Sequence, residues 1–153
     1  MVLMGSGAPS FQAALAAQDS KIQRITKLQE QGIIPEQITG LQDILPAYFS
    51  DPHFDMPTEM QPLYYNGSVE QYTWSALGDF DFTTETKDLD LPVLVLYGKD
   101  DPFGTSMVDA VVSSLSNAEV ELVLLEKCGH YWHECPKEFF SQVRDFLELP
   151  AAP

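Results

Sequence analysis

Two apolar runs, each followed by a polar turn, constrain the fold of this chain more than any other feature. The first run covers 92–97 and its turn ends in Asp101; the second covers 120–125 and its turn leads to His130. Helical patterns follow both turns, at about 105–115 and about 136–147. Strands and helices that alternate in this way form a parallel sheet with right-handed crossovers. Both runs are apolar throughout, which predicts that helices cover both faces of the sheet.

The two turns are expected to meet at one edge of that sheet. Neighbouring parallel strands lie about 4.8 Å apart and end on the same side. We therefore expect Asp101 and His130 to lie within hydrogen-bonding reach, directly or through one water. A catalytic histidine needs a carboxylate of this kind on one ring nitrogen. The alternative is an ordinary loop histidine, with Asp100 and Asp101 as turn formers before Pro102.

The N-terminal stretch is predicted to be a short strand followed by a long helix. Residues 2–4 are apolar, indicating a buried strand, and a glycine-rich turn follows. Ser10 is a typical N-cap, and the helix that it begins should run to about Gln31 before Gly32 ends it. Apolar residues at helical spacing should face the core, namely Phe11, Leu15, Ile22, Ile25 and Leu28.

The middle of the chain is predicted to be helical with one irregular connection. A second helix should begin at Pro35 and run toward Phe49, with Pro46 kinking it or ending it early. Residues 50–67 combine prolines and a glycine with aromatic residues, which indicates an irregular but packed connection. Further helical segments are expected from Ser68, a capping-box match with Gln71, to Leu77, and over 84–89.

Composition excludes several classes of protein. The chain has 153 residues, 44% hydrophobic and 11% aromatic, which is enough for one domain with a core and is unlike a disordered tail. Its net charge of −15 disfavours nucleic acid and anionic membrane surfaces as partners and favours cations or basic substrates. The acidic residues are scattered, as on a solvated surface or in a protein adapted to high salt. No apolar run approaches the roughly 20 residues of a membrane helix.

The cysteines and the N-terminus both favour a cytoplasmic protein. Cys128 and Cys135 are the only cysteines, and two residues seven positions apart do not form a disulfide framework, so we expect both to be reduced. Residues 1–4 have no basic stretch before them and are followed by Gly5, unlike a signal peptide.

The order of these segments resembles the late part of the α/β-hydrolases, in particular the proline iminopeptidase-like branch. Residues 128–136, Cys-Gly-His-Tyr-Trp-His-Glu-Cys-Pro, resemble the histidine turn and the start of the final helix. The resemblance implies an α/β fold with a short parallel sheet of about three strands, flanking helices and an inserted helical cap. It divides the chain into a partial core at 1–9 and 91–150, a cap at 10–90 and a tail at 151–153.

The resemblance also implies a function. The family's triad runs in the order serine, acid, histidine. Asp101 is preferred to Asp100 as the acid because it is fourth in a Gly-x-x-Asp turn, and His130 takes the place of the base. The sequence contains no Gly-x-Ser-x-Gly, and the family's oxyanion loop has no counterpart. The chain is therefore expected to be the C-terminal half of a serine hydrolase, without cofactors and inactive alone, or alternatively a non-catalytic binding or assembly module.

Other residues near the histidine turn are weaker candidates. His133 with Glu134 or Cys128 suggests a metal site, but the order matches neither zinc-protease helix motif and no second ligand cluster exists, so no metal is predicted. Cys128 lacks the geometry of a thiol nucleophile. Ser6 and Ser10 are expected to be turn and capping residues rather than nucleophiles.

Substrate-binding residues are not singled out by the sequence. If an N-terminal half completes the site, the substrate should be a peptide with a free N-terminus or a small ester or amide. Glu59 and Glu70 are candidates to hold a cationic amine. The open, apolar edge of residues 2–4 predicts a homodimer or a partner chain there. The aromatic residues of the cap should form its own small core or line the substrate pocket: Tyr48, Phe49, Tyr64, Tyr65, Tyr72 and Trp74.

Overall fold

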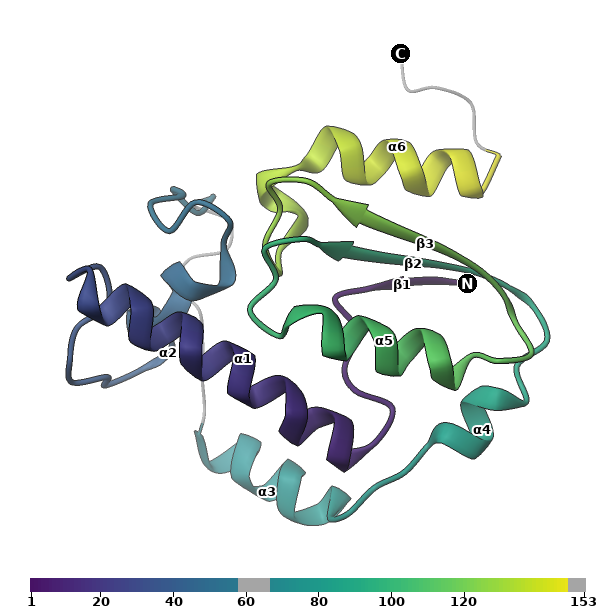
Figure 1. Ribbon diagram of the computed structural model, residues 1–153, viewed down its shortest axis with the longest axis horizontal. Helices are drawn as coiled ribbons and strands as arrows, with labels where there is room; N and C mark the ends of the chain where they lie inside the picture. The colour runs from purple at the N-terminus through teal and green to yellow at the C-terminus, as the bar shows by residue number, and fades with distance from the viewer. Residues whose placement is uncertain (58–66, 149–153) are drawn as a thin grey trace.

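The computed structural model of the protein describes residues 1–57 and 67–148. Three parallel strands form one sheet in the order β1-β2-β3, which confirms the predicted parallel α/β arrangement. One helix, α6, covers one face of the sheet, and α5 with α1 lies on the other face (Figure 1). The strands are β1 (Val2–Met4), β2 (Pro92–Gly98) and β3 (Glu119–Leu125), and the helices beside them are α5 (Gly104–Ser114) and α6 (Pro136–Phe146).

The central strand β2 carries the core on both of its faces. Val93, Val95 and Tyr97 pack in one cluster with residues of α5. Leu94 and Leu96 point to the other face and pack in a second cluster with residues of α6. The strand β3 differs from the prediction, because Leu122 and Leu124 remain 42% and 37% exposed. The helix α5 packs against the central strand and leaves these two side chains of the edge strand partly exposed.

The first helix, α1 (Phe11–Glu30), begins where the sequence predicts. Ser10 is its N-cap, and the Ser10 hydroxyl accepts a hydrogen bond from the amide three residues later. The buried positions were predicted wrongly in part, since Leu15 and Ile22 are 48% and 56% exposed. Ala17 is fully buried in their place, because α1 packs closely on α5 and a small side chain permits that approach.

The segment after α1 does not form the predicted helix from Pro35. A short helix α2 (Leu41–Ile44) leads instead into a 3-10 helix η1 (Leu45–Tyr48). The Asp43 carboxylate accepts hydrogen bonds from the backbone amides of residues 39 and 40, at 2.7 and 3.2 Å. These bonds place the N-cap at Gly40, so the helix begins at Leu41, six residues later than predicted.

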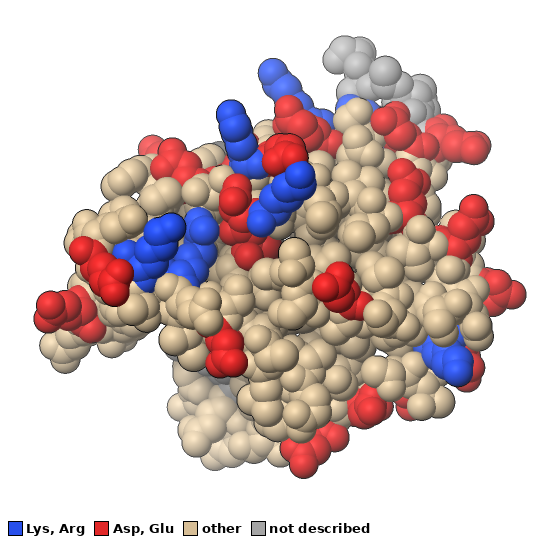
Figure 2. Space-filling model, viewed as in Figure 1, with Lys and Arg blue, Asp and Glu red and all other residues tan. Residues whose placement is uncertain are grey.

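The remaining helices are α3 (Gly67–Leu77) and α4 (Thr83–Lys87), both close to the predicted ranges. In the described part of the chain, no helix is long and apolar enough to cross a membrane. Acidic side chains are spread over the face visible in Figure 2 rather than gathered in one block. The predictions for Glu59, Tyr64, Tyr65 and the tail at 151–153 lie outside the described residues, as does the side chain of Glu70.

Candidate active site

Asp101 and His130 form a hydrogen-bonded pair at the carboxyl end of the sheet. Asp101 follows β2 and His130 follows β3, and the His130 Nδ1 atom lies 2.8 Å from the Asp101 Oδ2 atom. The Asp101 side chain is 3% exposed and the His130 side chain is 21% exposed. A carboxylate accepts, so Nδ1 is the donor, and in the corresponding neutral tautomer of the ring Nε2 is the nitrogen with the lone pair. The predicted contact between the two residues is therefore confirmed.

The two adjacent aspartates point in different directions. Asp101 also accepts a hydrogen bond from the backbone amide of Phe103 at 2.9 Å, which fixes its carboxylate. The Asp100 carboxylate accepts instead from the Ser50 hydroxyl at 2.7 Å. Only Asp101 reaches His130 with a hydrogen bond among the described contacts, in agreement with the preference from the sequence.

The histidine turn is held by a segment far away in the sequence. The His130 amide donates to the Tyr48 carbonyl at 2.7 Å. The Glu134 carboxylate accepts from the Gly129 amide at 2.8 Å and from the amides of residues 50 and 51 at 2.7 and 2.9 Å. Glu134 therefore joins the histidine turn to the 47–51 segment. Sequence reasoning considered Glu134 only as a metal ligand and missed this role, because its partners are distant backbone groups.

Arg24 holds the other side of the same segment. Its Nε donates to the Ala47 carbonyl at 2.7 Å, and its Nη2 donates to the Phe49 carbonyl. The 47–51 segment is thus fixed between α1 and the histidine turn. Nothing in the sequence singles out Arg24, which has the appearance of an ordinary polar residue of a helix.

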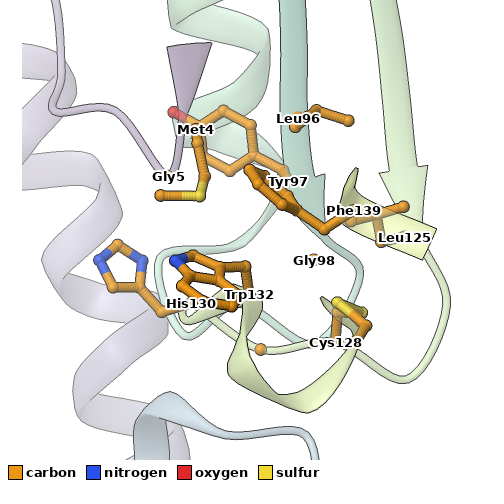
Figure 3. A pocket seen from close by; sticks show the side chains of 12 residues that line it. Met4, Gly5, Leu96, Tyr97, Gly98, Leu125, Cys128, His130, Trp132 and Phe139 are labelled. Carbon is orange, nitrogen blue, oxygen red and sulfur yellow. A yellow bond between two sulfur atoms is a disulfide. The ribbon is translucent and has the colours of Figure 1, made fainter. Parts of the chain in front are cut away.

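Cys128 and Cys135 form a disulfide, so the prediction that both are reduced was wrong. Their Cα atoms lie 5.9 Å apart because the chain between them folds back through a 3-10 helix, η3 (Trp132–Glu134). The separation of seven positions between the two cysteines does not by itself predict that the chain folds back and brings them together. Both cysteines are buried, and the bond closes the turn that carries His130 (Figure 3). Neither cysteine is available as a thiol nucleophile.

His133 packs away from the Asp101–His130 pair. Its ring stacks on Trp132 with 3.9 Å between the ring centroids, and burial lowers the pKa of His133. In the part of the chain that the structure describes, no group of three histidine, cysteine or acidic side chains is placed to hold a metal ion.

The two serines near the site have structural partners. Ser10 caps α1, and the Ser6 hydroxyl lies 3.0 Å from the Tyr97 hydroxyl. The Tyr97 hydroxyl also donates to the Ser6 carbonyl at 2.7 Å, and burial raises the pKa of Tyr97. No hydrogen bond among the described residues joins either serine to His130. Both serines are therefore the turn and capping residues that the sequence predicts.

A cavity of about 260 Å³ opens beside the His130 ring. Tyr48 and Trp74 line it, whereas Tyr72 is 77% exposed and Phe49 is buried against Phe54 and Tyr131. The aromatic residues are thus divided between cavity wall, surface and core. The other lining residues come from the turn after β1, from α1, and from the start of α5: Gly5, Ser6, Gly7, Ala8, Ala14, Gln18, Lys21, Phe103 and Met107.

A second, apolar hollow lies between β1 and α6. Met4, Leu96, Trp132 and Phe139 line it, and His130 stands at its rim (Figure 3). The strand β1 is at the edge of the sheet and pairs only with β2 among the described strands. Met4 is 41% exposed, so this strand is not the buried one that the sequence predicts.

Comparison with known proteins gives structural neighbours only. No family model and no curated protein matches the sequence. Several solved structures align with 96% of this chain, including three at 18–20% identity. They are proline iminopeptidase from Mycobacterium smegmatis (20% identity, TM-score 0.56), MenH from S. aureus (19%, 0.52) and an esterase from Exiguobacterium antarcticum (18%, 0.54).

The sheet, the two turns and these neighbours define an α/β-hydrolase fold. The chain spans 56%, 57% and 56% of the length of the three neighbouring chains. It has the fold of the C-terminal part of an α/β-hydrolase.

Proposed function

We propose that this chain is the C-terminal half of a serine hydrolase and supplies the acid and the base of its triad. The observation that carries the proposal is the hydrogen bond of 2.8 Å between His130 and Asp101, beside a cavity at the carboxyl end of the sheet. Active sites of open α/β sheets lie at this end. The free Nε2 lone pair is the group that a general base requires.

The reaction would follow the usual triad chemistry. His130 Nε2 takes the proton of a serine hydroxyl as its oxygen attacks the substrate carbonyl, and then gives the proton to the leaving group. Asp101 holds the ring and stabilises the imidazolium that forms. The serine and the oxyanion donors would come from an N-terminal hydrolase half. The substrate would be a peptide with a free N-terminus or a small ester or amide.

The N-terminal half would bind along β1. Support comes from the unpaired edge of β1, the apolar hollow beside it and the 56% coverage of the iminopeptidase chain. A strand paired there would end next to the turn of Gly5, where an added Cβ would lie 3.3 Å from the His130 ring. In this arrangement residues 1–9 and 91–150 complete the catalytic domain, and residues 10–90 cover it.

The 153-residue chain alone should show no serine-hydrolase turnover, because it lacks the nucleophile and the oxyanion donors. We would assay an aminoacyl-naphthylamide and a short-chain nitrophenyl ester, with a fluorophosphonate probe in parallel. The chain fused behind the N-terminal half of the Mycobacterium smegmatis enzyme should label at its serine and hydrolyse one of these substrates. His130→Ala should abolish that turnover. Stoichiometric labelling of a serine in the chain alone would contradict the proposal.

The chain alone should also associate through β1, because an unpaired edge strand recruits another chain. Along a parallel strand, the N–H and C=O groups of successive residues point alternately toward one neighbouring strand and toward the other. The backbone groups of residues 1 and 5 bond to β2. Those of Met4 therefore point away from β2, toward the open edge of the sheet. Light scattering at low micromolar concentration should give twice 17.1 kDa. Met4→Lys should restore the monomer, whereas Ile22→Lys, at an exposed position of α1, should not. A monomeric mass for the unmodified chain would refute this prediction.

A further inference from the structure

The Glu134 carboxylate follows His130 in the same turn and accepts three backbone hydrogen bonds from two separate segments. Its Oε2 atom accepts from the Gly129 amide at 2.8 Å and from the Ser50 amide at 2.7 Å. Its Oε1 atom accepts from the Asp51 amide at 2.9 Å. Hydrogen bonds to an ionised carboxylate are roughly twice as strong as those between neutral groups. Both oxygens of this side chain therefore hold main chain.

These bonds fix the main chain that carries the His130 ring. The Gly129 amide bonds to Glu134, and the next amide along the chain, that of His130, donates to the Tyr48 carbonyl at 2.7 Å. Gly129 is buried, and an added Cβ there would lie 2.2 Å from the Tyr48 carbonyl oxygen, so the two segments are in direct contact. Glu134 thus holds the residue before the imidazole and also the segment on which the imidazole's own amide depends.

The disulfide between Cys128 and Cys135 cannot replace Glu134. It joins the two ends of the histidine turn to each other, so by itself it does not place the turn on the rest of the molecule. Contacts with the 47–51 segment do so, and Arg24 fixes that segment on α1 through the carbonyls of residues 47 and 49. Glu134 is the side chain that connects the turn to this fixed segment.

We infer that Glu134 is a positioning residue, which holds the His130 imidazole within reach of Asp101 at the wall of the cavity. It acts through the main chain of the turn and is not a catalytic residue. Asp101 can bind the ring at 2.8 Å only where the main chain brings the ring to it. A displacement of about 1 Å in a catalytic group can lower a rate by about 100-fold. As a statement about turnover, the inference rests on the proposed function.

The first test follows the Nδ1 proton of His130 by NMR in the full chain. A proton shared with a carboxylate gives a resonance far downfield, and Asp101→Asn marks the result when that acceptor is lost. Glu134→Ala removes all three bonds, so the resonance should move upfield or broaden beyond detection. Glu134→Gln removes the same charge but keeps one oxygen, which can still accept from the amides of residues 50 and 129, so the resonance should remain. An unchanged resonance in Glu134→Ala, or equal loss in both variants, would overturn the inference.

Two substitutions in α6 are the matched controls. Glu138→Gln, at an exposed position, changes the net charge equally. Val143→Ala removes apolar contact from the cluster beneath α6 and so lowers stability, but it leaves the three bonds intact. Both should leave the resonance in place. A loss in either control like that in Glu134→Ala would overturn the inference, because charge or stability alone would then explain the effect.

A second, shorter variant covers the case in which Glu134→Ala does not fold. Glu134→Asp keeps the charge but shortens the side chain by one methylene, so its oxygens should reach the 47–51 segment poorly. The Nδ1 resonance should again move upfield or broaden, although the net charge is unchanged. A resonance at its original position in Glu134→Asp would overturn the inference.

Turnover in the fused enzyme separates this inference from the proposed function. Glu134→Ala should lower kcat by about 100-fold with little change in KM, and both controls should retain full activity. A fused enzyme that is inactive in every form, with the NMR response as expected, would support the role of Glu134 and count against the proposed function alone. An active fused enzyme whose kcat is unchanged in Glu134→Ala would count against the role of Glu134 alone.

Discussion

Asp101→Asn should lower kcat of the fused, active enzyme by about 10⁴-fold, the effect seen when a triad aspartate becomes an amide. The Asp101 carboxylate accepts from His130 Nδ1 at 2.8 Å and so favours the neutral tautomer in which Nε2 has the lone pair. An asparagine can present its NH₂ group there, which favours the opposite tautomer and leaves no lone pair for the serine proton. The substitution preserves the shape of the side chain, so the loss should appear in kcat with little change in stability.

Asp100→Asn is the matched control. The Asp100 carboxylate accepts from the Ser50 hydroxyl and not from His130, and an asparagine carbonyl oxygen can still accept there, so the substitution at most weakens one hydrogen bond. We expect a change in kcat of no more than about fivefold, in keeping with the net value of such a bond. The ¹⁵N shifts of the His130 ring report the tautomer in the chain alone and should change only in Asp101→Asn. The reverse pattern would assign the acid to Asp100.

Gly129→Ala should lower the free energy of unfolding by about 3–5 kcal/mol, at the severe end of single substitutions. An added Cβ would lie 2.2 Å from the Tyr48 carbonyl oxygen and 2.7 Å from the Phe49 Cα atom. Both are backbone atoms, so no side-chain rotation relieves the overlap. The histidine turn and the 47–51 segment would have to separate, with loss of the bond between His130 and Tyr48.

Gly7→Ala provides the comparison. An added Cβ at Gly7 would meet nothing within 4 Å, and glycine-to-alanine changes at compatible positions alter stability by about 1 kcal/mol or less. Urea unfolding of both variants, followed by far-UV circular dichroism, gives the two free energies. A similar small change for both would show that the histidine turn does not pack against residues 48 and 49 in solution.

The sheet and the contact between Asp101 and His130 could be predicted because they depend on patterns local to each strand. A continuous apolar run marks a covered strand, and the ends of neighbouring parallel strands meet wherever the sheet forms. The disulfide between Cys128 and Cys135 could not be predicted, since it depends on how a turn and a 3-10 helix return the chain. The exposure of Leu122 likewise depends on how α5 packs against the sheet, and the sequence of β3 alone does not predict that packing.

The segment after α1 was the least predictable part, because its hydrogen bonds come from residues distant in sequence. Arg24 and Glu134 bind its backbone from opposite sides. Backbone carbonyls and amides look the same in every sequence, so no residue type marks them as partners. At Pro35 the helix signal was overridden locally, because the Asp43 carboxylate accepts from the amides of residues 39 and 40 and the helix begins after them.

The bond between the His130 amide and the Tyr48 carbonyl also limits how this sequence can diverge. Residues 47–51 and 128–135 must keep their lengths, because an insertion in either would move the imidazole away from Asp101. Cavity residues outside these two stretches, such as Trp74 and Gln18, are under no such restriction. Substitutions in the walls can therefore change the shape of the cavity while the hydrogen bond between Asp101 and His130 stays in place.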